Sequence, residues 1–338
     1  MFIYQAQLAF KIWHNVLPEI EDVGVKGSIA SIDKLQKRAK NVVACVVLFL
    51  FTVSATIFAD LSKNPNGEYP YDTFMIPTIV EIMKFIVSAC FLLKTKAYGE
   101  PLVMRYTVKS FFIYSIPGLL YFMSNNCVFY IIEDLGPSQF QILKNLNVFS
   151  TAILMRFVLN RHLTWLKWKA LILLVIGAVL TQLMDAPDTM KGTVRGYFVV
   201  FIYSVSSAAA GVHIEKALKE GGEGDCIHWQ NLQLYFFGVM FGLISVWFRG
   251  INSNKTFWNL DGFNYFAYAT VLSLTLCGLS ISVILKYLDN IAKCFVGSLS
   301  MLFVTLHESL HREKPFSIHY FLAIVLIFLA LEQYNIPQ

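Results

Sequence analysis

The sequence carries little charge for its length. Asp, Glu, Lys and Arg make up only 14% of its 338 residues, against about 25% in soluble domains. The net charge of +5 is modest, and the basic residues form no dense run. Low charge with high hydrophobicity excludes an intrinsically disordered chain, and the missing basic run argues against a phosphate-neutralising surface, so we expect no nucleic-acid partner.

Paired cysteines are missing as well. Five of the six cysteines lie inside apolar runs and only Cys226 lies in a polar stretch, with no CxxC or CxxxC spacing. This pattern supports neither a disulfide framework nor a cysteine zinc site, and we expect no cofactor. No basic segment opens the N-terminus, and a mixed segment of about 40 residues precedes the first long apolar run, so we expect no cleavable signal peptide.

Apolar residues are in excess, with 56% of the chain and a mean hydropathy of +0.57. They gather into ten runs, most of them close to the roughly 20 residues that cross a bilayer. The runs are continuous and do not alternate in polarity, which argues against a transmembrane β-barrel. The sequence therefore predicts an all-α polytopic membrane protein with about ten transmembrane helices in a lipid bilayer. The predicted spans are 41–60, 72–93, 110–132, 138–159, 168–184, 196–215, 229–248, 263–287, 291–310 and 317–334.

The loop charges orient these spans. With the N-terminus in the cytosol, the cytosolic segments carry about twice as many Lys and Arg residues as the opposite loops, in agreement with the positive-inside rule. Both termini are then expected in the cytosol. The one N-x-[ST] sequon, Asn254-Lys255-Thr256, falls in a lumenal loop, where it is either a glycosylation site or a chance tripeptide.

A weak internal repeat divides the chain. Residues 164–171 resemble residues 317–324, which lie five predicted spans further on. Because five is odd, the second copy is inverted in the membrane. Inverted repeats are typical of transporters, whose substrate site lies near the midplane between the halves. We expect an N-terminal segment at 1–40, a first five-helix half at 41–184 and a second five-helix half at 195–334.

Polar side chains inside the spans need partners, because lipid solvates neither charges nor unpaired amides. Glu81 and Lys84 lie three residues apart on the second span and can neutralise each other on one helix face. We expect a structural ion pair there rather than a substrate contact. Asn125 and Asn126 lie mid-run in the third span, where they either bond to a neighbouring helix or contact a ligand.

A polar stripe opens the fourth span. Gln141, Lys144 and Asn147 share one helix face at three-residue spacing, which indicates a water-filled cavity. In the alternative interpretation, the side chain of Lys144 extends to the membrane interface and binds no ligand.

The densest polar group follows the eighth span, over Lys286-Tyr287-Leu288-Asp289-Asn290-Ile291-Ala292-Lys293. If this segment is helical, Lys286, Asp289 or Asn290, and Lys293 line one face, where two cations around one anion leave a net positive site. Such a site suits a phosphate or pyrophosphate, which takes charge-assisted hydrogen bonds. The alternative is a set of ordinary interfacial charges beside a short loop.

One motif points to an enzyme instead. His307-Glu308-Ser309-Leu310-His311 fits the H-E-x-x-H pattern, in which two histidines on a helix face bind zinc and the glutamate acts as a base. An intramembrane metalloprotease also needs a third ligand, typically from an LDG-like segment further along the chain, whereas Leu260-Asp261-Gly262 lies upstream. We therefore interpret the match as chance, and we expect neither a metal site nor an enzyme.

Several of these segments together resemble the nucleotide-sugar transporter family of the drug/metabolite transporter superfamily, and most of all its CMP-sialic acid and UDP-galactose branch. The resemblance covers about residues 41–336. It is carried by Val80–Lys84, Tyr121–Asn126, Gln141–Trp168, Gly211–Lys216, Trp229–Tyr235 and Lys286–Lys293.

The resemblance implies ten spans in two inverted halves, a Golgi or ER membrane, and antiport of a cytosolic nucleotide sugar for a lumenal nucleoside monophosphate. It also implies that two amide segments line the substrate cavity and that Lys286 contacts phosphate. The cavity residues so implied are Asn125, Asn126, Asn231, Gln233 and Tyr235. The family commonly has a lysine in the fourth span where this chain has Asn147, and here Lys144 lies one turn earlier.

We therefore predict an antiporter for a UDP-sugar of the UDP-galactose type in the Golgi membrane, acting alone or as a homodimer. CMP-sialic acid or another metabolite is the alternative cargo of the same fold. In this prediction, Lys286 with Lys144 or Lys293 binds the diphosphate, and the amides at 125, 126 and 231 recognise the base or ribose.

Overall fold

The computed structural model describes residues 25–66, 68–98, 104, 107–135, 137–182, 193–220, 226–253, 260–311 and 318–335. The chain divides into two compact units, Met1–Val42 and Val43–Gln338. The sequon at Asn254 and most of the predicted N-terminal segment lie outside the described residues. The packing discussed below is that of the second unit.

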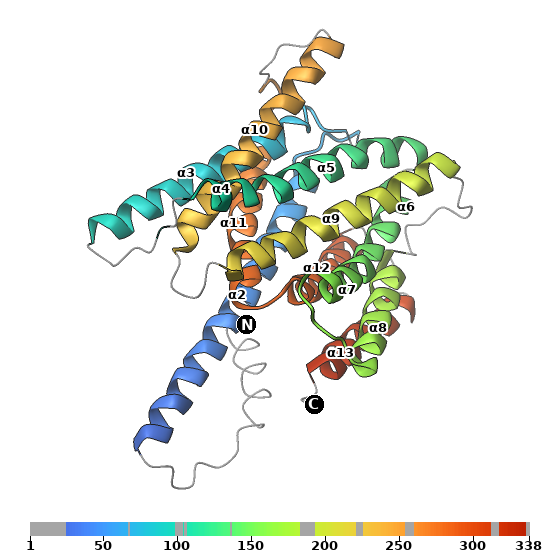
Figure 1. Cartoon of the computed structure of the whole chain (residues 1–338). Coiled ribbons are helices and arrows are strands. Elements are labelled where there is room, and N and C mark those ends of the chain that lie inside the picture. The colour runs from blue at the N-terminus through green and yellow to red at the C-terminus, as the bar shows by residue number, and fades with distance from the viewer. Residues whose placement is uncertain are drawn as a thin grey trace. The chain divides into compact units, whose positions relative to one another are not determined.

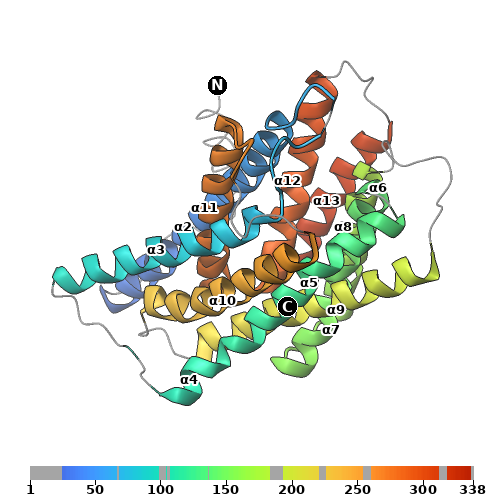
Figure 2. The same cartoon turned by 90° about the horizontal axis from the view of Figure 1, so that it is seen from above.

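All elements in the described residues are helices, and the ten apolar runs each coincide with helical segments (Figures 1 and 2). Within that part of the chain, six helices are long and apolar enough to cross a membrane: α2 from Ala39 onward, α3, α9, α10, α11 and α12. The all-helical, polytopic prediction is confirmed, while the count of ten spans stays a prediction. The elements are α2 (Val25–Leu61), α3 (Met75–Ala97), α4 (Val108–Ile113), α5 (Ser115–Leu135), α6 (Pro137–Leu143), the 3-10 turn η1 (Lys144–Leu146), α7 (Asn147–Val158), α8 (Trp165–Gln182), α9 (Val194–Glu220), α10 (Ile227–Ser253), α11 (Tyr265–Tyr287), α12 (Asn290–His311) and α13 (Ile318–Asn335).

A proline divides the third predicted span. α4 ends at Ile113 and α5 begins at Ser115, because Pro117 supplies no N–H to the carbonyl of Ile113 and its ring clashes with that carbonyl. Pro77 causes no such break. It lies in the first turn of α3, where backbone N–H groups have no helical partner in any case.

The fourth predicted span, expected as one helix over 138–159, is interrupted. α6 gives way to η1, and α7 follows. Nδ2 of Asn145 donates to the carbonyl of Ile142 at 3.2 Å, and so competes for the acceptor that the amide of Leu146 would use in a continuous α-helix. The predicted polar stripe therefore runs across a change of helical geometry.

The helices of the second unit pack in a few extensive pairs. α5 lies along α9, α8 lies along α13, and α3 lies along α10 (Figures 1 and 2). A buried apolar cluster among α7, α8, α12 and α13 includes Met155, Leu171, Leu174, Phe295 and Ile327. This cluster joins helices that come from both predicted halves.

The starts of α3 and α11 lie at the same end of the unit. Asn264 caps α11 by accepting from the amide of Ala267 at 2.9 Å, and it donates to the carbonyl of Ser62, just after α2, at 2.8 Å. The hydroxyl of Ser62 bonds that of Tyr71, just before α3, at 2.6 Å. The other end of α11 therefore lies about 33 Å away, the length of one span.

Gly177 on α8 marks a close approach to α13. A Cβ at this position would lie 2.7 Å from Cγ1 of Ile327 and 3.3 Å from the carbonyl oxygen of Ala323. We expect Gly177→Ala to lower the free energy of unfolding by about 1–3 kcal/mol through overpacking, seen as a lower melting temperature of the detergent-purified protein. Gly297→Ala is the matched control, because nothing lies within 4 Å of its added Cβ. Equal losses in both variants would contradict this packing of α8 on α13.

Candidate functional site

A cavity of about 420 Å³ lies among α3, α5, α10 and α11. This volume is in the range of small-molecule sites. The walls are mainly apolar, and each of these helices contributes polar groups, so the cavity suits a ligand that has both rings and hydrogen-bonding groups. The polar lining residues are Thr78, Glu81, Lys84, Tyr121, Asn125, Asn126, Tyr235, Ser245 and Ser282.

An ion pair lies in this cavity. Lys84 is buried and donates from Nζ to Oε1 of Glu81 at 2.5 Å. Its ammonium also lies 4.5 Å from the ring centroid of Tyr235, which is a cation–π distance. The side chain of Glu81 is 28% exposed. The pair is therefore accessible from the cavity while its two charges neutralise each other.

Two glycines make room for this pair. A Cβ at Gly238 of α10 would lie 2.5 Å from Oε2 of Glu81, and a Cβ at Gly278 of α11 would lie 2.6 Å from Cδ of Lys84. The pair from α3 is thus wedged between two neighbouring helices that approach closely at small residues. The G-x-x-x-G spacing of Gly238 and Gly242 is a sequence signal for this approach, although the sequence prediction does not include it.

Asn125, Asn126 and Tyr235, which the family resemblance assigns to the substrate site, all line the cavity. Asn125 is exposed, whereas Nδ2 of Asn126 donates to the carbonyl of Phe122 at 2.7 Å. The buried hydroxyl of Tyr235 shares a hydrogen bond of 2.8 Å with that of Ser282. Of these three residues, Asn125 therefore has the polar side chain most accessible to a ligand.

Asn231, Gln233 and Lys286 are buried outside the residues that line the cavity. Nζ of Lys286 donates to Oε1 of Gln230 at 2.9 Å, and Nε2 of Gln230 donates to the carbonyl of Leu218 at 3.2 Å. Gln233 bonds within its own helix, and Oδ1 of Asn231 is a buried acceptor that has no hydrogen-bond partner among the described residues. The structure thus separates the two buried amides and Lys286 from the lining.

The polar residues of the fourth span also lie elsewhere. Nδ2 of Asn147 donates to the hydroxyl of Ser207 on α9 at 3.1 Å, and its Oδ1 accepts from Thr151 at 3.4 Å. Lys144 is half-buried in η1, and the side chain of Gln141 lies outside the described part of the chain. Asn147 therefore ties α7 to α9.

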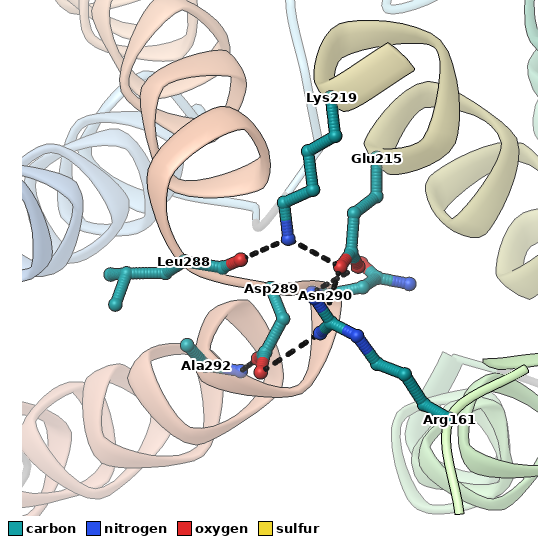
Figure 3. Close-up of polar contacts among 7 residues, drawn as sticks. All are labelled: Arg161, Glu215, Lys219, Leu288, Asp289, Asn290 and Ala292. Atoms are coloured by element: carbon teal, nitrogen blue, oxygen red, sulfur yellow. Dashed lines mark hydrogen bonds and ion pairs between the residues drawn. The ribbon is translucent and has the colours of Figure 1, made fainter. Parts of the chain in front are cut away.

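A second polar cluster lies where α9 and α11 end and α12 begins (Figure 3). Its central carboxylate, Glu215, is fully buried and accepts from Nζ of Lys219 at 2.6 Å and from the backbone amide of Asn290 at 2.9 Å. The guanidinium of Arg161 reaches Glu215 at 3.2 Å. We name this cluster the Arg161–Glu215 network. It comprises Arg161, Glu215, Lys219, Leu288, Asp289 and Asn290.

The end of α7 positions Arg161. Asn160 has a positive φ of 50°, and the amide of Arg161 donates to the carbonyl of Met155 at 3.3 Å. A left-handed residue just after the last helical turn is a common way for a helix to end. Asparagine tolerates this conformation better than most residues, so the chain leaves α7 with Arg161 fixed in the turn.

Asp289 and Asn290 belong to this network and do not line the cavity. Oδ2 of Asp289 lies 3.7 Å from Arg161, and its Oδ1 accepts from the amide of Ala292 at 2.7 Å in the first turn of α12. The side chain of Asn290 is fully buried against Gly211, where an added Cβ would lie 2.6 Å from its Nδ2.

The segment from Lys286 to Lys293 is not one helix, so the condition for a single polar face is not met, and the alternative of charges beside a short loop agrees with the structure. α11 ends at Tyr287 and α12 begins at Asn290, with the backbone of Leu288 far from helical values between them. Lys293 is half-buried on α12, whereas Lys286 is buried at the end of α11. The break arises because the two helices are separate membrane spans and the chain must turn between them.

Arg161 and Glu215 are not among the residues that the sequence predicts for the site. The available signal is a carboxylate near the end of an apolar, small-residue helix with a lysine four positions later, a spacing at which side chains pair. Its partner Arg161 is distant in the sequence and carries no local signal.

The H-E-x-x-H motif lies at the end of α12. His307 is half-buried, while the side chains of Glu308 and His311 lie outside the described part. Among the side chains that the structure describes, no three His, Cys, Asp or Glu residues are grouped so that they could hold a metal ion.

The pair of Glu81 and Lys84 leads to a stability prediction. Glu81→Gln leaves the buried ammonium of Lys84 without its anion, so we expect a lower melting temperature in detergent. Adding Lys84→Met should recover much of the loss, with a coupling energy of about 0.5–3 kcal/mol between the two positions. The measurement is a double-mutant cycle of unfolding free energies. Strictly additive losses would show that the two side chains do not stabilise each other.

The sequence model for nucleotide-sugar transporters matches residues 36–335. CMP-sialic acid transporter 1 of Oryza sativa subsp. japonica is 33% identical over 301 residues, which cover 86% of this chain and 92% of the relative. A probable UDP-sugar transporter protein of Xenopus tropicalis is 29% identical, covering 88% of this chain and 94% of the relative. The UDP-galactose translocator of Homo sapiens is 31% identical over 66% of this chain and 57% of its own length.

A solved crystal structure shares the fold. It superposes with a TM-score of 0.64 over 88% of this chain and 98% of its own chain, at 13% sequence identity. The matched family and these relatives are transporters and not enzymes, so an intramembrane zinc protease is excluded. From the family model and the apolar helices together, the chain is a multi-pass membrane protein that belongs to the nucleotide-sugar transporter family.

Proposed function

We propose that the chain exchanges a cytosolic UDP-sugar of the UDP-galactose type for a lumenal nucleoside monophosphate across the Golgi membrane. The observation that carries this proposal is the cavity, whose lining comes from both predicted halves: α3 and α5 from the first, α10 and α11 from the second. A site between two halves can be exposed to either side of a membrane by their relative rocking.

The lining suits the parts of a nucleotide sugar. The amide of Asn125 can donate to and accept from a base or ribose, and Asn126 lies beside it. Tyr121 and Phe241 supply aromatic surface in the same cavity, on which a base can stack. Apolar walls with few polar groups give such a ligand both affinity and orientation.

Lys286 is the proposed phosphate partner, assisted by Lys144 or Lys293. Leu285 lines the cavity, and Lys286 follows it directly. Its ammonium donates to the amide oxygen of Gln230, and a phosphate oxygen can replace that neutral acceptor with a charge-assisted bond.

The helix contacts support two inverted five-helix halves. Each apolar run has a counterpart five runs later, and several of the helix contacts are consistent with this exchange. α8 packs on its counterpart α13, and α3 packs on its counterpart α10. α5 packs on α10 as α11 packs on α3. An approximate two-fold relation between the halves would give this pattern.

The loop charges support cytosolic termini, because the loops on that side carry about twice as many cations. Under this orientation the Arg161–Glu215 network faces the cytosol. The start of α3 then faces the lumen.

CMP-sialic acid is the second candidate substrate. The observation that favours it is the similarity to CMP-sialic acid transporter 1 of Oryza sativa, which extends over 92% of that relative.

Counterflow in reconstituted vesicles tests the substrate. Vesicles preloaded with UMP should take up labelled UDP-galactose faster than vesicles preloaded with CMP or left empty, because an antiporter needs a counter-substrate of the matching base. A panel of UDP-, GDP- and CMP-sugars sets the specificity. Faster exchange of CMP-sialic acid for CMP would favour the second candidate, and no exchange of any nucleotide sugar would contradict both.

Replacement of Lys286 tests the phosphate contact. We expect Lys286→Ala to lower UDP-galactose uptake by about tenfold or more, because a charge-assisted bond to phosphate is lost, while the protein still reaches the membrane. Lys216→Ala is the control, since the half-buried Lys216 pairs with Glu220 on its own helix at 3.7 Å and does not line the cavity. Unchanged uptake in Lys286→Ala would remove Lys286 from the site.

A further inference from the structure

The Arg161–Glu215 network joins the two predicted halves at one end of the second unit. Arg161 comes from the turn between α7 and α8 in the first half, and the other members come from α9 and the α11–α12 junction in the second half (Figure 3). α11 ends in this network, whereas its other end is the one that Asn264 ties to Ser62. The network therefore lies at the end opposite the start of α3.

The cavity stops at the network. Ile214 and Leu285 line the cavity, and the next residues along α9 and α11 are Glu215 and Lys286. Ile214 is 3% exposed, and Leu285 and Glu215 are fully buried. Near the other end the lining includes the exposed Pro77 in the first turn of α3. The described conformation is thus closed at the network end.

The contacts that lie within the second half differ in burial from those that Arg161 makes from the first half. Lys219 donates both to Glu215 and to the carbonyl of Leu288, and the amide of Asn290 donates to Glu215. These bonds stay within the second half, and they satisfy the buried carboxylate. The side chain of Arg161, in contrast, is 44% exposed. Its guanidinium lies 3.2 Å from the carboxylate of Glu215 and 3.7 Å from that of Asp289.

Arg161 is therefore the detachable member. If the α7–α8 turn moves away, Glu215 keeps Lys219 and the amide of Asn290, so no buried carboxylate is left alone, which would be strongly unfavourable. The guanidinium itself returns to water, and an ion pair with one exposed partner is weak enough to break reversibly. The second half thus holds the carboxylate of Glu215 in place at all times, and Arg161 of the first half can bind it and leave it.

We propose that Arg161 is a latch that holds the cavity closed at the network end by binding Glu215 and Asp289, and that its release opens this end. The role of the latch in transport depends on the proposed function, but its effect on access to the cavity does not. Asp289 contributes twice, because the carboxylate that meets Arg161 also accepts from the amide of Ala292 at the start of α12.

A reporter cysteine measures the latch without any substrate. In full-length protein with its six native cysteines replaced by alanine, Ile214→Cys is labelled by a membrane-impermeant thiol reagent applied to vesicles from the network side. We expect Arg161→Gln to raise the labelling rate by about fivefold, the scale of a partly exposed ion pair, and Arg161→Lys to restore much of the protection. Lys216→Gln is the matched control, because Lys216 pairs within α9, and it should leave the rate unchanged.

Asp289→Asn is the second variant. It retains an acceptor for the amide of Ala292 and removes one of the two anions that face Arg161, so it should raise the rate in the same direction by less. Unchanged labelling in both Arg161→Gln and Asp289→Asn, or an equal rise in Lys216→Gln, would overturn the latch. Faster labelling together with no exchange of any nucleotide sugar would leave the latch standing and contradict the proposed function.

Discussion

The full burial of Glu215 is the constraint on which much of the second unit depends. A carboxylate without exposed surface is tolerated in a membrane protein only where cations and N–H donors replace water. Lys219, the backbone amide of Asn290 and Arg161 supply them here. The bonds from Lys219 and from the amide of Asn290 require the end of α9 and the α11–α12 junction to meet. Arg161 brings the α7–α8 turn to the same carboxylate as a third, separable connection.

The buried charges of the cavity also need partners, but here the partners come from a single helix. Glu81 and Lys84 neutralise each other within one helix, and Gly238 and Gly278 allow α10 and α11 to close around them. The cavity therefore keeps charged groups in an apolar wall at no net charge. A ligand phosphate would have to displace Glu81 from Lys84 or bind a different cation. For this reason the proposed phosphate contact is with Lys286.

The sequence predicts the helices well because apolar runs report directly on burial in lipid, and each run coincides with helical structure. It fails where a side chain redirects the backbone: Asn145 competes for a carbonyl and interrupts the fourth span. The face from Lys286 to Lys293 required one continuous helix, and it is absent because α11 ends at Tyr287, at the span end that the apolar runs predict. The contact of Arg161 with Glu215 is tertiary, and nothing near either residue in the sequence indicates it.

The most direct measurement of the central idea, that the halves separate at the network end, is a distance between spin labels placed on each side of the network. His162 and Glu220 are both exposed and come from the first and second half. With both replaced by labelled cysteines in the protein without native cysteines, we expect two distance populations whose ratio shifts when UMP or UDP-galactose is added. A single distance that is unchanged under every condition would contradict a latch between moving halves.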